Sequence, residues 1–239
     1  MICGTVTILD DFRGDTIDEY TYIEFLTEDK SGSILVNKIM EKYSIGKNIG
    51  WKTHSFGGIG HIPKKLKTGN QVKTHKLLHD LPNYLVGMGS SLAEMSAKTA
   101  IFVILDCDDK DCAKLKQDLV EMARKVGVKT QTFFCIAIEE MEAWLLGDEE
   151  ALMTAYPNAR LNLLQKYEQD SIVGTWELLA NVVYKGGLSA LNKEATSYYE
   201  KGAFKCECAE NIGEQMDIRR NISPSFQYFI RKMDGVYQA

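Results

Sequence analysis

The sequence lacks the features that mark membrane, secreted and disulfide-rich proteins. Its longest apolar runs fall far short of the roughly 18 residues that cross a bilayer, and its N-terminus has no signal-peptide pattern. Its six cysteines show no CxxC pairing, so neither a zinc site nor a disulfide framework is indicated. These absences predict a protein of the reducing cytoplasm with no membrane segment.

Internal repeats and low-complexity segments are also absent from the 239 residues. Hydrophobic residues make up 45% and charged residues 26%, which is ordinary for a soluble globular protein. A chain of this length forms one large domain or a core with an appended part, and it can bury a sizeable interior.

Acidic residues are missing between Glu41 and Asp80, where the chain carries eight lysines instead. The net charge of −5 therefore leaves about −13 on the remainder of the chain. A basic block of this kind is typical of contact with an anionic partner, and nucleic acid could bind through four of its lysines, Lys52, Lys64, Lys65 and Lys67. A solvated, lysine-rich surface loop is the other interpretation.

Part of this block, residues 46–69, shows no helical or strand periodicity and contains six glycines. It matches neither the GxxxxGK[ST] loop nor GxGxxG, so nucleotide binding has little support. Residues 70–97 have a helical pattern, with a break expected at Pro82. We therefore treat residues 46–97, approximately, as a basic, glycine-rich insertion.

The clearest strand signal is the unbroken apolar run Ile101–Leu105, which is typical of a strand buried on both faces of a parallel sheet. Further strands are indicated in YTYIEFLTED, at Lys129–Ile138 and, more briefly, at Thr5–Leu9. Helical spacing follows three of these strands, at Ser33–Tyr43, at about Lys110–Val126 and from Glu139 through Leu145.

This alternation predicts an α/β fold over residues 1–156, with a mostly parallel, Rossmann-like sheet and helices on both faces. Beyond Pro157 the pattern is mainly helical, and we expect residues 157–239 to form a helical part packed on the sheet. The helices expected there are Ala159–Gln169, Ile172–Tyr184, Leu188–Lys201 and Ser225–Met233.

Three of the predicted strands end in carboxylates. Glu28 follows the first, Asp106 and Asp108 follow the second, and Glu142 follows the third. Ligands of open α/β sheets bind beyond the carboxyl ends of the strands, so these acids should meet at one edge. Neighbouring acids are weaker ligand candidates or helix caps: Asp109, Asp111, Glu139 and Glu140.

Carboxylates crowded at such an edge are the ligands that Mg²⁺ or Mn²⁺ takes in proteins. Alternation along a strand should direct the Asp106 and Asp108 side chains to the same side and Cys107 into the interior. A bound metal would polarise a phosphoryl oxygen and lower the pKa of bound water, and Glu142 is the best candidate for a second metal.

Other side chains have two open interpretations each. His54 and His61 flank the glycine-rich loop, where they could contact phosphate or occur incidentally. Trp144 is expected in the core rather than as a stacking platform. Lys205 could neutralise transition-state charge or be an ordinary surface lysine.

The segments LTEDKSG and FVILDCDDKD, each followed by a helix, resemble the Toprim domain of topoisomerases, primases and overcoming-lysogenization-defect nucleases. The signature of that domain is a Glu after the first strand and Asp-x-Asp after a later one, here Glu28, Asp106 and Asp108. More closely, the chain resembles an uncharacterised prokaryotic Toprim-like family that is often encoded beside an ATPase in proposed phage-defence loci. This likeness extends to IAIEEMEAWLLGD and to a tail with Lys205, AENIGEQMD and SPSFQYF.

The resemblance implies a Toprim-like fold and a Mg²⁺- or Mn²⁺-dependent nuclease, the effector of a defence system with a partner ATPase. Its implied metal ligands are Glu28, Asp106, Asp108 and Glu142, with Lys205 as a further catalytic residue. One departure is Asp29, because this position is usually Gly in the family, and we expect a left-handed turn that Asp tolerates.

Two other functions remain open. An acid site that does not bind metal would make the chain a binding or regulatory module, and Asp29 favours this alternative. A haloacid-dehalogenase-type phosphotransferase also begins from a hydrophobic run and Asp-x-Asp. That family, however, expects Thr or Val two residues after the second Asp, where this chain has Lys110.

Overall fold

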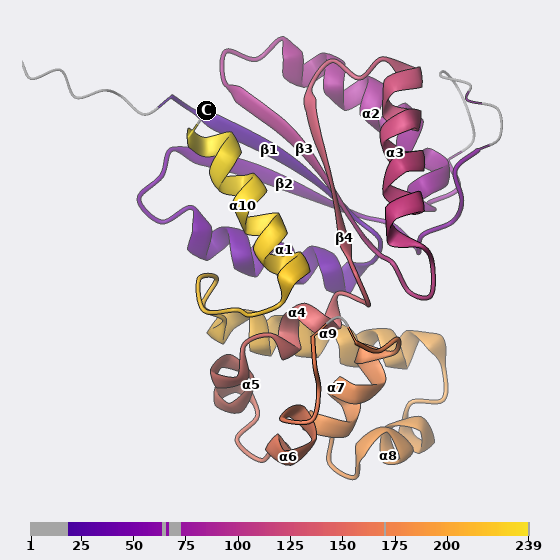
Figure 1. The fold of residues 1–239 in the computed structure, drawn as a ribbon, viewed down its shortest axis with the longest axis vertical. Helices are drawn as coiled ribbons and strands as arrows, with labels where there is room; N and C mark the ends of the chain where they lie inside the picture. The colour runs from indigo at the N-terminus through magenta and orange to yellow at the C-terminus, as the bar shows by residue number, and fades with distance from the viewer. Residues whose placement is uncertain (1–18, 64–65, 67–72, 170, 239) are drawn as a thin grey trace, which may run out of the picture.

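A computed structural model describes residues 19–63, 66, 73–169 and 171–238. Four strands form one sheet in the order β2-β1-β3-β4, and every pairing is parallel (Figure 1). The strands are β1 (Thr21–Thr27), β2 (Ile49–Ser55), β3 (Lys98–Asp106) and β4 (Gln131–Ala137). The predicted α/β class with a parallel, Rossmann-like sheet is confirmed, while the expected strand at Thr5–Leu9 lies outside the described residues.

Helices cover both faces of the sheet and continue into a helical part below it (Figure 1). They are α1 (Lys30–Tyr43), α2 (Leu77–Ala93), α3 (Cys112–Val126), α4 (Glu142–Leu146), α5 (Glu149–Ala155), α6 (Leu161–Leu164), α7 (Thr175–Val183), α8 (Gly187–Glu194), α9 (Tyr198–Gln215) and α10 (Pro224–Gln238).

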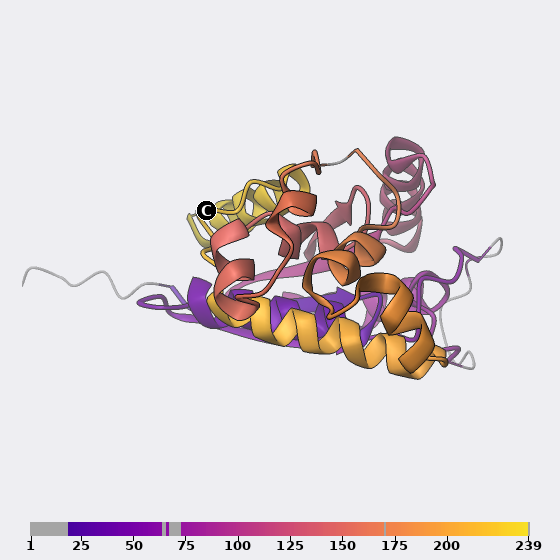
Figure 2. The same cartoon turned by 90° about the horizontal axis from the view of Figure 1, so that it is seen from below.

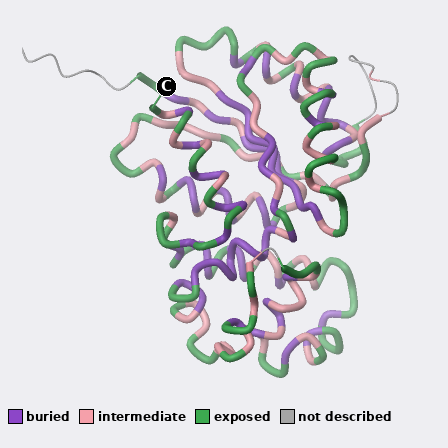
Figure 3. The backbone as a smooth tube through the Cα atoms, in the orientation of Figure 1, coloured by how far each residue is buried: buried purple, intermediate pink, exposed green. Residues whose placement is uncertain are grey.

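The apolar run of β3 is buried on both sides because successive side chains point to opposite faces. Phe102 and Ile104 join the core formed with α1, α10 and the helical part. Ile101 and Val103 join a second core beneath α2 and α3. The purple centre of the sheet in Figure 3 shows this double burial. It explains why β3 reads as a continuous apolar run rather than an alternating one.

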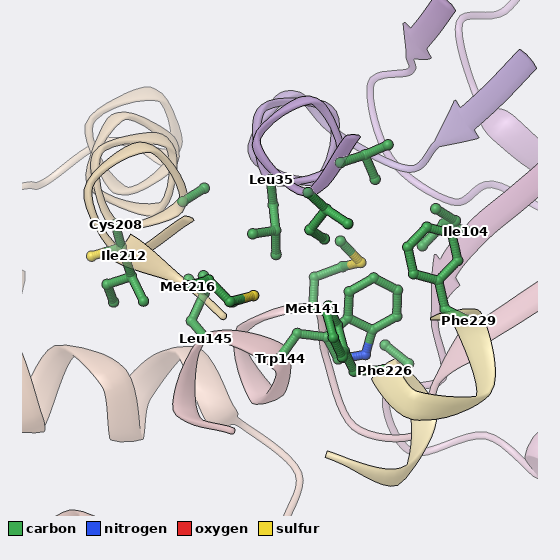
Figure 4. Packing of buried hydrophobic residues seen from close by; sticks show 14 of the residues in the cluster. Leu35, Ile104, Met141, Trp144, Leu145, Cys208, Ile212, Met216, Phe226 and Phe229 are labelled. Atoms are coloured by element: carbon green, nitrogen blue, oxygen red, sulfur yellow. The ribbon is translucent and has the colours of Figure 1, made fainter. Parts of the chain in front are cut away.

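The chain beyond β4 returns to the sheet twice. Helix α9 packs along α1, as Figure 2 shows from below, and α10 lies on β3 and β4. Trp144 of α4 lies in the core between these elements, fully buried and stacked on Phe229 with ring centroids 5.3 Å apart (Figure 4). Its indole N–H donates to the Ser225 hydroxyl at 2.9 Å. The predicted core position of Trp144 is confirmed.

The basic insertion differs from expectation in two places. Residues 49–55 form the edge strand β2, paired along its whole length with β1, although their sequence shows no strand periodicity. Backbone hydrogen bonds to the edge of β1 stabilise this strand, although its own sequence has no strand pattern. Pro82 lies inside α2 without ending it, because buried leucines on both sides (Leu78, Leu81 and Leu85) hold the helix against the sheet.

Two helices of the C-terminal part have other bounds than predicted. The expected helix Leu188–Lys201 is two helices, because Ser197 begins α9 with a capping box in which it exchanges hydrogen bonds with Glu200. Between Ala159 and Gln169 only the short helix α6 forms. Tertiary packing of short segments, rather than their propensity, sets these boundaries.

A disulfide joins Cys107 and Cys112, contrary to the expectation of reduced cysteines. The C-x4-C spacing is outside the CxxC pattern, but the turn between β3 and α3 brings the two Cα atoms to 5.8 Å, within the range that a disulfide spans. Cys107 is fully buried, as predicted. Within the described ranges, no helix combines the length and apolarity needed to span a bilayer.

Candidate functional site

The ends of β1 and β3 form the topological switch point of the sheet. From β1 the chain passes through α1 to β2 on one side, whereas from β3 it passes through α3 to β4 on the other. Connections that leave in opposite directions open a crevice between the two strand ends, which is where α/β sheets bind ligands. Glu28 follows β1 directly, and Asp106 is the last residue of β3. Their carboxylates therefore belong to the ligand-binding edge.

Glu28 and Asp106 are in direct contact. The backbone N–H of Asp106 donates to Glu28 Oε2 at 3.4 Å. The Asp106 carboxylate is buried, and its Oδ1 accepts from the backbone N–H of Met141 at 2.9 Å. This last bond joins the end of β3 to the turn after β4. The turn that carries Glu142 is therefore held next to the end of β3.

Glu142 follows Met141 and completes the cluster. Its side chain is only 3% exposed, and its Oε1 lies 3.0 Å from Nζ of Lys205, which comes from α9. The other carboxylate oxygen, Oε2, is buried and has no hydrogen-bond partner among the described residues. A buried carboxylate oxygen without a partner costs free energy, and a bound cation would satisfy it. Lys205 is thus not a surface lysine but part of the site.

The carboxylates of the candidate site have raised pKa values. Burial and then the charges of Glu142 and Glu28 hold the pKa of Asp106 well above its usual range. Burial, with the charges of Asp108 and Asp29, raises the pKa of Glu28. Burial raises the pKa of Glu142 to about 7 even though Lys205 lowers it. A site that makes its carboxylates costly to ionise favours a cation beside them.

Lys205 shows the reverse effect. Burial lowers its pKa, but the charges of Glu142, Asp106 and Asp29 outweigh burial and raise it. The ammonium therefore stays charged and faces three acids from three different turns. It is the cation that this arrangement already contains.

Asp29 does not occupy the left-handed turn predicted for it. Its backbone is extended, with φ −141° and ψ −178°, and it is the N-cap of α1. Its carboxylate accepts from the Gly32 N–H at 2.8 Å and from the Ser31 hydroxyl at 2.9 Å. Its charge nevertheless acts on Glu28, Asp106 and Glu142. Sequence reasoning treated this residue only as a departure; its position before a helix was the signal of a cap.

Asp108 lies two residues beyond the end of β3. Strand β3 ends at Asp106, so alternation does not extend to Asp108, which has a left-handed φ of 50°. Its carboxylate is 2.7 Å from Lys110 Nζ and its side chain is 39% exposed. The prediction that both side chains point the same way relied on strand alternation, which does not reach Asp108, and the charge of Asp108 nevertheless raises the pKa of Glu28.

The neighbouring acids have structural partners. Asp111 is the N-cap of α3, as predicted, and accepts from the Lys114 N–H at 2.9 Å. Asp109 is exposed. Glu139 accepts from the Tyr167 hydroxyl and from the Ile172 N–H, and Glu140 from the Trp176 N–H at 2.9 Å. Glu139 and Glu140 therefore connect the helical part to the end of β4, and the charge of Glu140 also raises the pKa of Glu142.

The basic stretch is only partly described. Lys52 is exposed on the edge strand β2, whereas Lys64, Lys65 and Lys67 lie outside the described residues. His54 pairs with Glu24 across β2 and β1 at 2.7 Å. His61 lies against the ring of His79, with centroids 6.1 Å apart. Neither histidine has a described contact with the acid cluster.

The donors of the cluster suit Mg²⁺ or Mn²⁺, because they are carboxylate oxygens and one of them is buried without a partner. They do not already converge, since within the ranges described no three His, Cys, Asp or Glu side chains form a group that could hold a metal ion. Glu28, Asp106 and Glu142 would be the ligands, with a shift of side chains to bring them together.

Comparison with known proteins shows the family of this chain. A family model described as a domain of unknown function (DUF4276) matches residues 27–234. The chain belongs to the DUF4276 family. No curated protein and no solved structure matches it. The DUF4276 region begins one residue before Glu28 and includes Asp106, Asp108, Glu142 and Lys205, so the whole candidate site lies within it.

Proposed function

We propose that this DUF4276 protein is a metal-dependent nuclease that hydrolyses phosphodiester bonds of DNA or RNA with Mg²⁺ or Mn²⁺. One observation carries the proposal: Glu28, Asp106 and Glu142 follow three neighbouring strands of the sheet, and burial and the charges of nearby carboxylates raise their pKa values. The sequence motifs that resemble Toprim-like proteins, which occur in the same order in this chain, also support a nuclease. They also support a role as the effector of a defence system with a partner ATPase.

Each residue has a role in this proposal. Glu28, Asp106 and Glu142 would hold the metal, with Asp108 at the open side of the site, where it is half exposed. When bound, Mg²⁺ polarises a phosphoryl oxygen and lowers the pKa of a bound water. Lys205 keeps its charge beside Glu142 and would neutralise negative charge that develops on the phosphate.

Exposed side chains near the site support nucleic acid as the substrate. Tyr198 and Tyr199 are 86% and 84% exposed at the start of α9, the helix that carries Lys205. Tyr198, Lys201 and Lys205 share one face of that helix by their spacing of three and four residues. Aromatic rings and lysines along one path are the combination on which unpaired bases stack while cations hold the backbone.

The test is cleavage by purified protein of single- and double-stranded DNA and RNA, with Mg²⁺, with Mn²⁺ or with EDTA. We expect cleavage with metal that falls by about 10²–10³-fold in Asp106→Asn, since the loss of a charged group at a reaction centre has effects of this order. Asp109→Asn, in the same turn but exposed, is the matched control and should retain activity. Equal cleavage by wild type and Asp106→Asn would contradict the proposal.

One observation favours the alternative of a binding or regulatory module without catalysis. Lys205 already gives Glu142 a cationic partner, and no ready group of three ligands is found within the described ranges. Calorimetry with Mn²⁺ separates the two. Binding at or below millimolar Kd that is lost in Asp106→Asn supports the nuclease, whereas no binding in wild type supports the module.

A further inference from the structure

A second cavity lies in the helical part, away from the acid cluster. It has a volume of about 490 Å³, within the range of small-molecule sites. The segment after α5 and the turn between α7 and α8 form its walls, with Tyr156, Arg160, Tyr184 and Lys185 among the lining residues. Its lining contains two cations and no acid, although the chain as a whole has a net charge of −5.

Arg160 is held in place at the wall of this cavity. Its backbone N–H donates to the Val182 carbonyl at 2.9 Å, and its Nη2 donates to the Tyr184 carbonyl at 2.7 Å. No carboxylate of the described residues forms an ion pair with Arg160 or Lys185. A guanidinium oriented by a backbone carbonyl, and without an ion pair to a described carboxylate, is suited to binding a phosphate.

The turn beside Arg160 requires glycine. Gly186 and Gly187 both have left-handed φ values, 85° and 73°. A Cβ at Gly187 would lie 3.1 Å from Arg160 Nη2, so a side chain there would crowd the guanidinium. Gly187 thus keeps the space beside the guanidinium of Arg160 open.

Two aromatic rings supply an apolar surface. The hydroxyl of Tyr184 donates to Glu194 at 2.6 Å, and the ring of Tyr184 packs edge-on against Phe204. The hydroxyl of Tyr156 accepts from Asn211 at 3.2 Å. Both hydroxyls are bonded to α8 or α9, which fixes the rings at the cavity wall. The carboxylate of Glu194 is bound to the hydroxyl of Tyr184 and is not among the lining residues.

We propose that this cavity binds a nucleoside monophosphate group, with the phosphate on Arg160 and Lys185 and the base beside Tyr156 and Tyr184. Such a group comes from a free mononucleotide or from the 5′-phosphorylated end of a nucleic-acid strand. The proposal does not depend on nuclease activity, because none of its residues belongs to the acid cluster.

Calorimetry at constant ionic strength tests it with five probes: AMP, adenosine, inorganic phosphate, a 5′-phosphorylated oligonucleotide and the 5′-hydroxyl form of the same oligonucleotide. We expect AMP or the phosphorylated oligonucleotide to bind with Kd below about 1 mM, and adenosine and inorganic phosphate at least about tenfold more weakly. AMP as the tighter probe identifies a free nucleotide, and the phosphorylated strand as the tighter probe identifies a strand end.

Variants locate the binding. Lys185→Gln should weaken binding about tenfold, which is about 1.4 kcal/mol. Arg160→Gln should weaken binding further. Arg160→Lys should restore only part of the affinity that Arg160→Gln loses, because lysine cannot make the bidentate contact of arginine with a phosphate. Lys166→Gln, an exposed lysine outside the cavity, and Asp106→Asn should bind as wild type does.

The proposal is overturned by any of three results. The first is no binding of AMP or the phosphorylated strand at millimolar concentration. The second is inorganic phosphate binding as tightly as AMP. The third is Lys185→Gln and Arg160→Lys binding as tightly as wild type. Circular dichroism of each variant shows whether it is folded, and Lys185→Gln changes only an exposed side chain with no described partner.

Discussion

Lys205 and Glu142 form an ion pair across the boundary between the helical part and the strand-end turns, with Nζ 3.0 Å from Oε1. Lys205 comes from α9, which packs along α1, and Glu142 begins α4. The pair links the C-terminal helices to the acid cluster. It makes the helical part a component of the site rather than an appendage.

Removal of Lys205 should destabilise the fold when Glu142 is ionised. In Lys205→Met, the buried Glu142 loses its counter-charge, and we expect a loss of about 3 kcal/mol in unfolding free energy at pH 8. At pH 5, Glu142 is protonated and the loss should be much smaller. Urea denaturation in EDTA measures both. Lys201→Met, one turn earlier in α9, is the control, and the double variant Lys205→Met with Glu142→Gln should recover most of the loss.

The metal-free protein should lose stability as pH rises from about 4.5 to 7. Glu142 has a pKa raised from 4.5 to about 7, so the folded state binds its proton more tightly than the unfolded state does. That contribution is fully present below pH 4.5 and is lost as pH rises to 7, amounting to about 3 kcal/mol. Glu142→Gln should flatten this dependence. Unfolding curves at pH 5 and 7.5 in EDTA test it, and a wild-type stability independent of pH would show the shift to be wrong.

Asp29 should stabilise the fold by capping the N-terminus of helix α1. Asp29→Ala removes the bonds to the Gly32 N–H and the Ser31 hydroxyl and should cost about 1 kcal/mol, while Asp29→Asn, which still caps, should cost less. Chemical denaturation at constant pH compares them. If Asp29→Gly were more stable than wild type, the turn would favour the left-handed conformation after all.

The disulfide can be tested by thiol counting. Alkylation of the denatured, unreduced protein should label Cys135, Cys206 and Cys208 but leave Cys107 and Cys112 unlabelled. Cys112→Ser should expose Cys107 to the reagent and lower stability by about 2 kcal/mol, as expected for a loop of this length. Peptide mass spectrometry reads each position. Full labelling of Cys107 in unreduced wild type would contradict the pairing.

The exposed tyrosines of α9 should matter for binding and not for folding. Replacing Tyr198 and Tyr199 by Ala should weaken binding of a single-stranded oligonucleotide by about 1–3 kcal/mol for each stacked base and leave the melting temperature unchanged. Ile222→Ala, also exposed but on another surface, is the control. Fluorescence anisotropy in EDTA measures binding without cleavage. Unchanged affinity in the double variant would remove this surface from the proposed substrate path.

The local sequence pattern was sufficient to predict the strand and helix ends that carry the candidate site. The apolar run of β3, the acids at the strand ends and the cap Asp111 all depend on neighbours within a few residues, and each was predicted. The edge strand β2 was not, because its strand conformation depends on pairing with β1, which lies more than 20 residues earlier in the chain.

The sequence by itself determined the α/β class and the placement of Glu28, Asp106 and Glu142 after neighbouring strand ends, since parallel strands bring their carboxyl ends to one edge. Only the tertiary structure decided which acids remain in the cluster. Asp108 has a left-handed backbone and pairs with Lys110, Glu139 and Glu140 accept hydrogen bonds from distant backbone groups, and Lys205 is brought in from α9. Those contacts join residues far apart in the chain, and no local spacing encodes them.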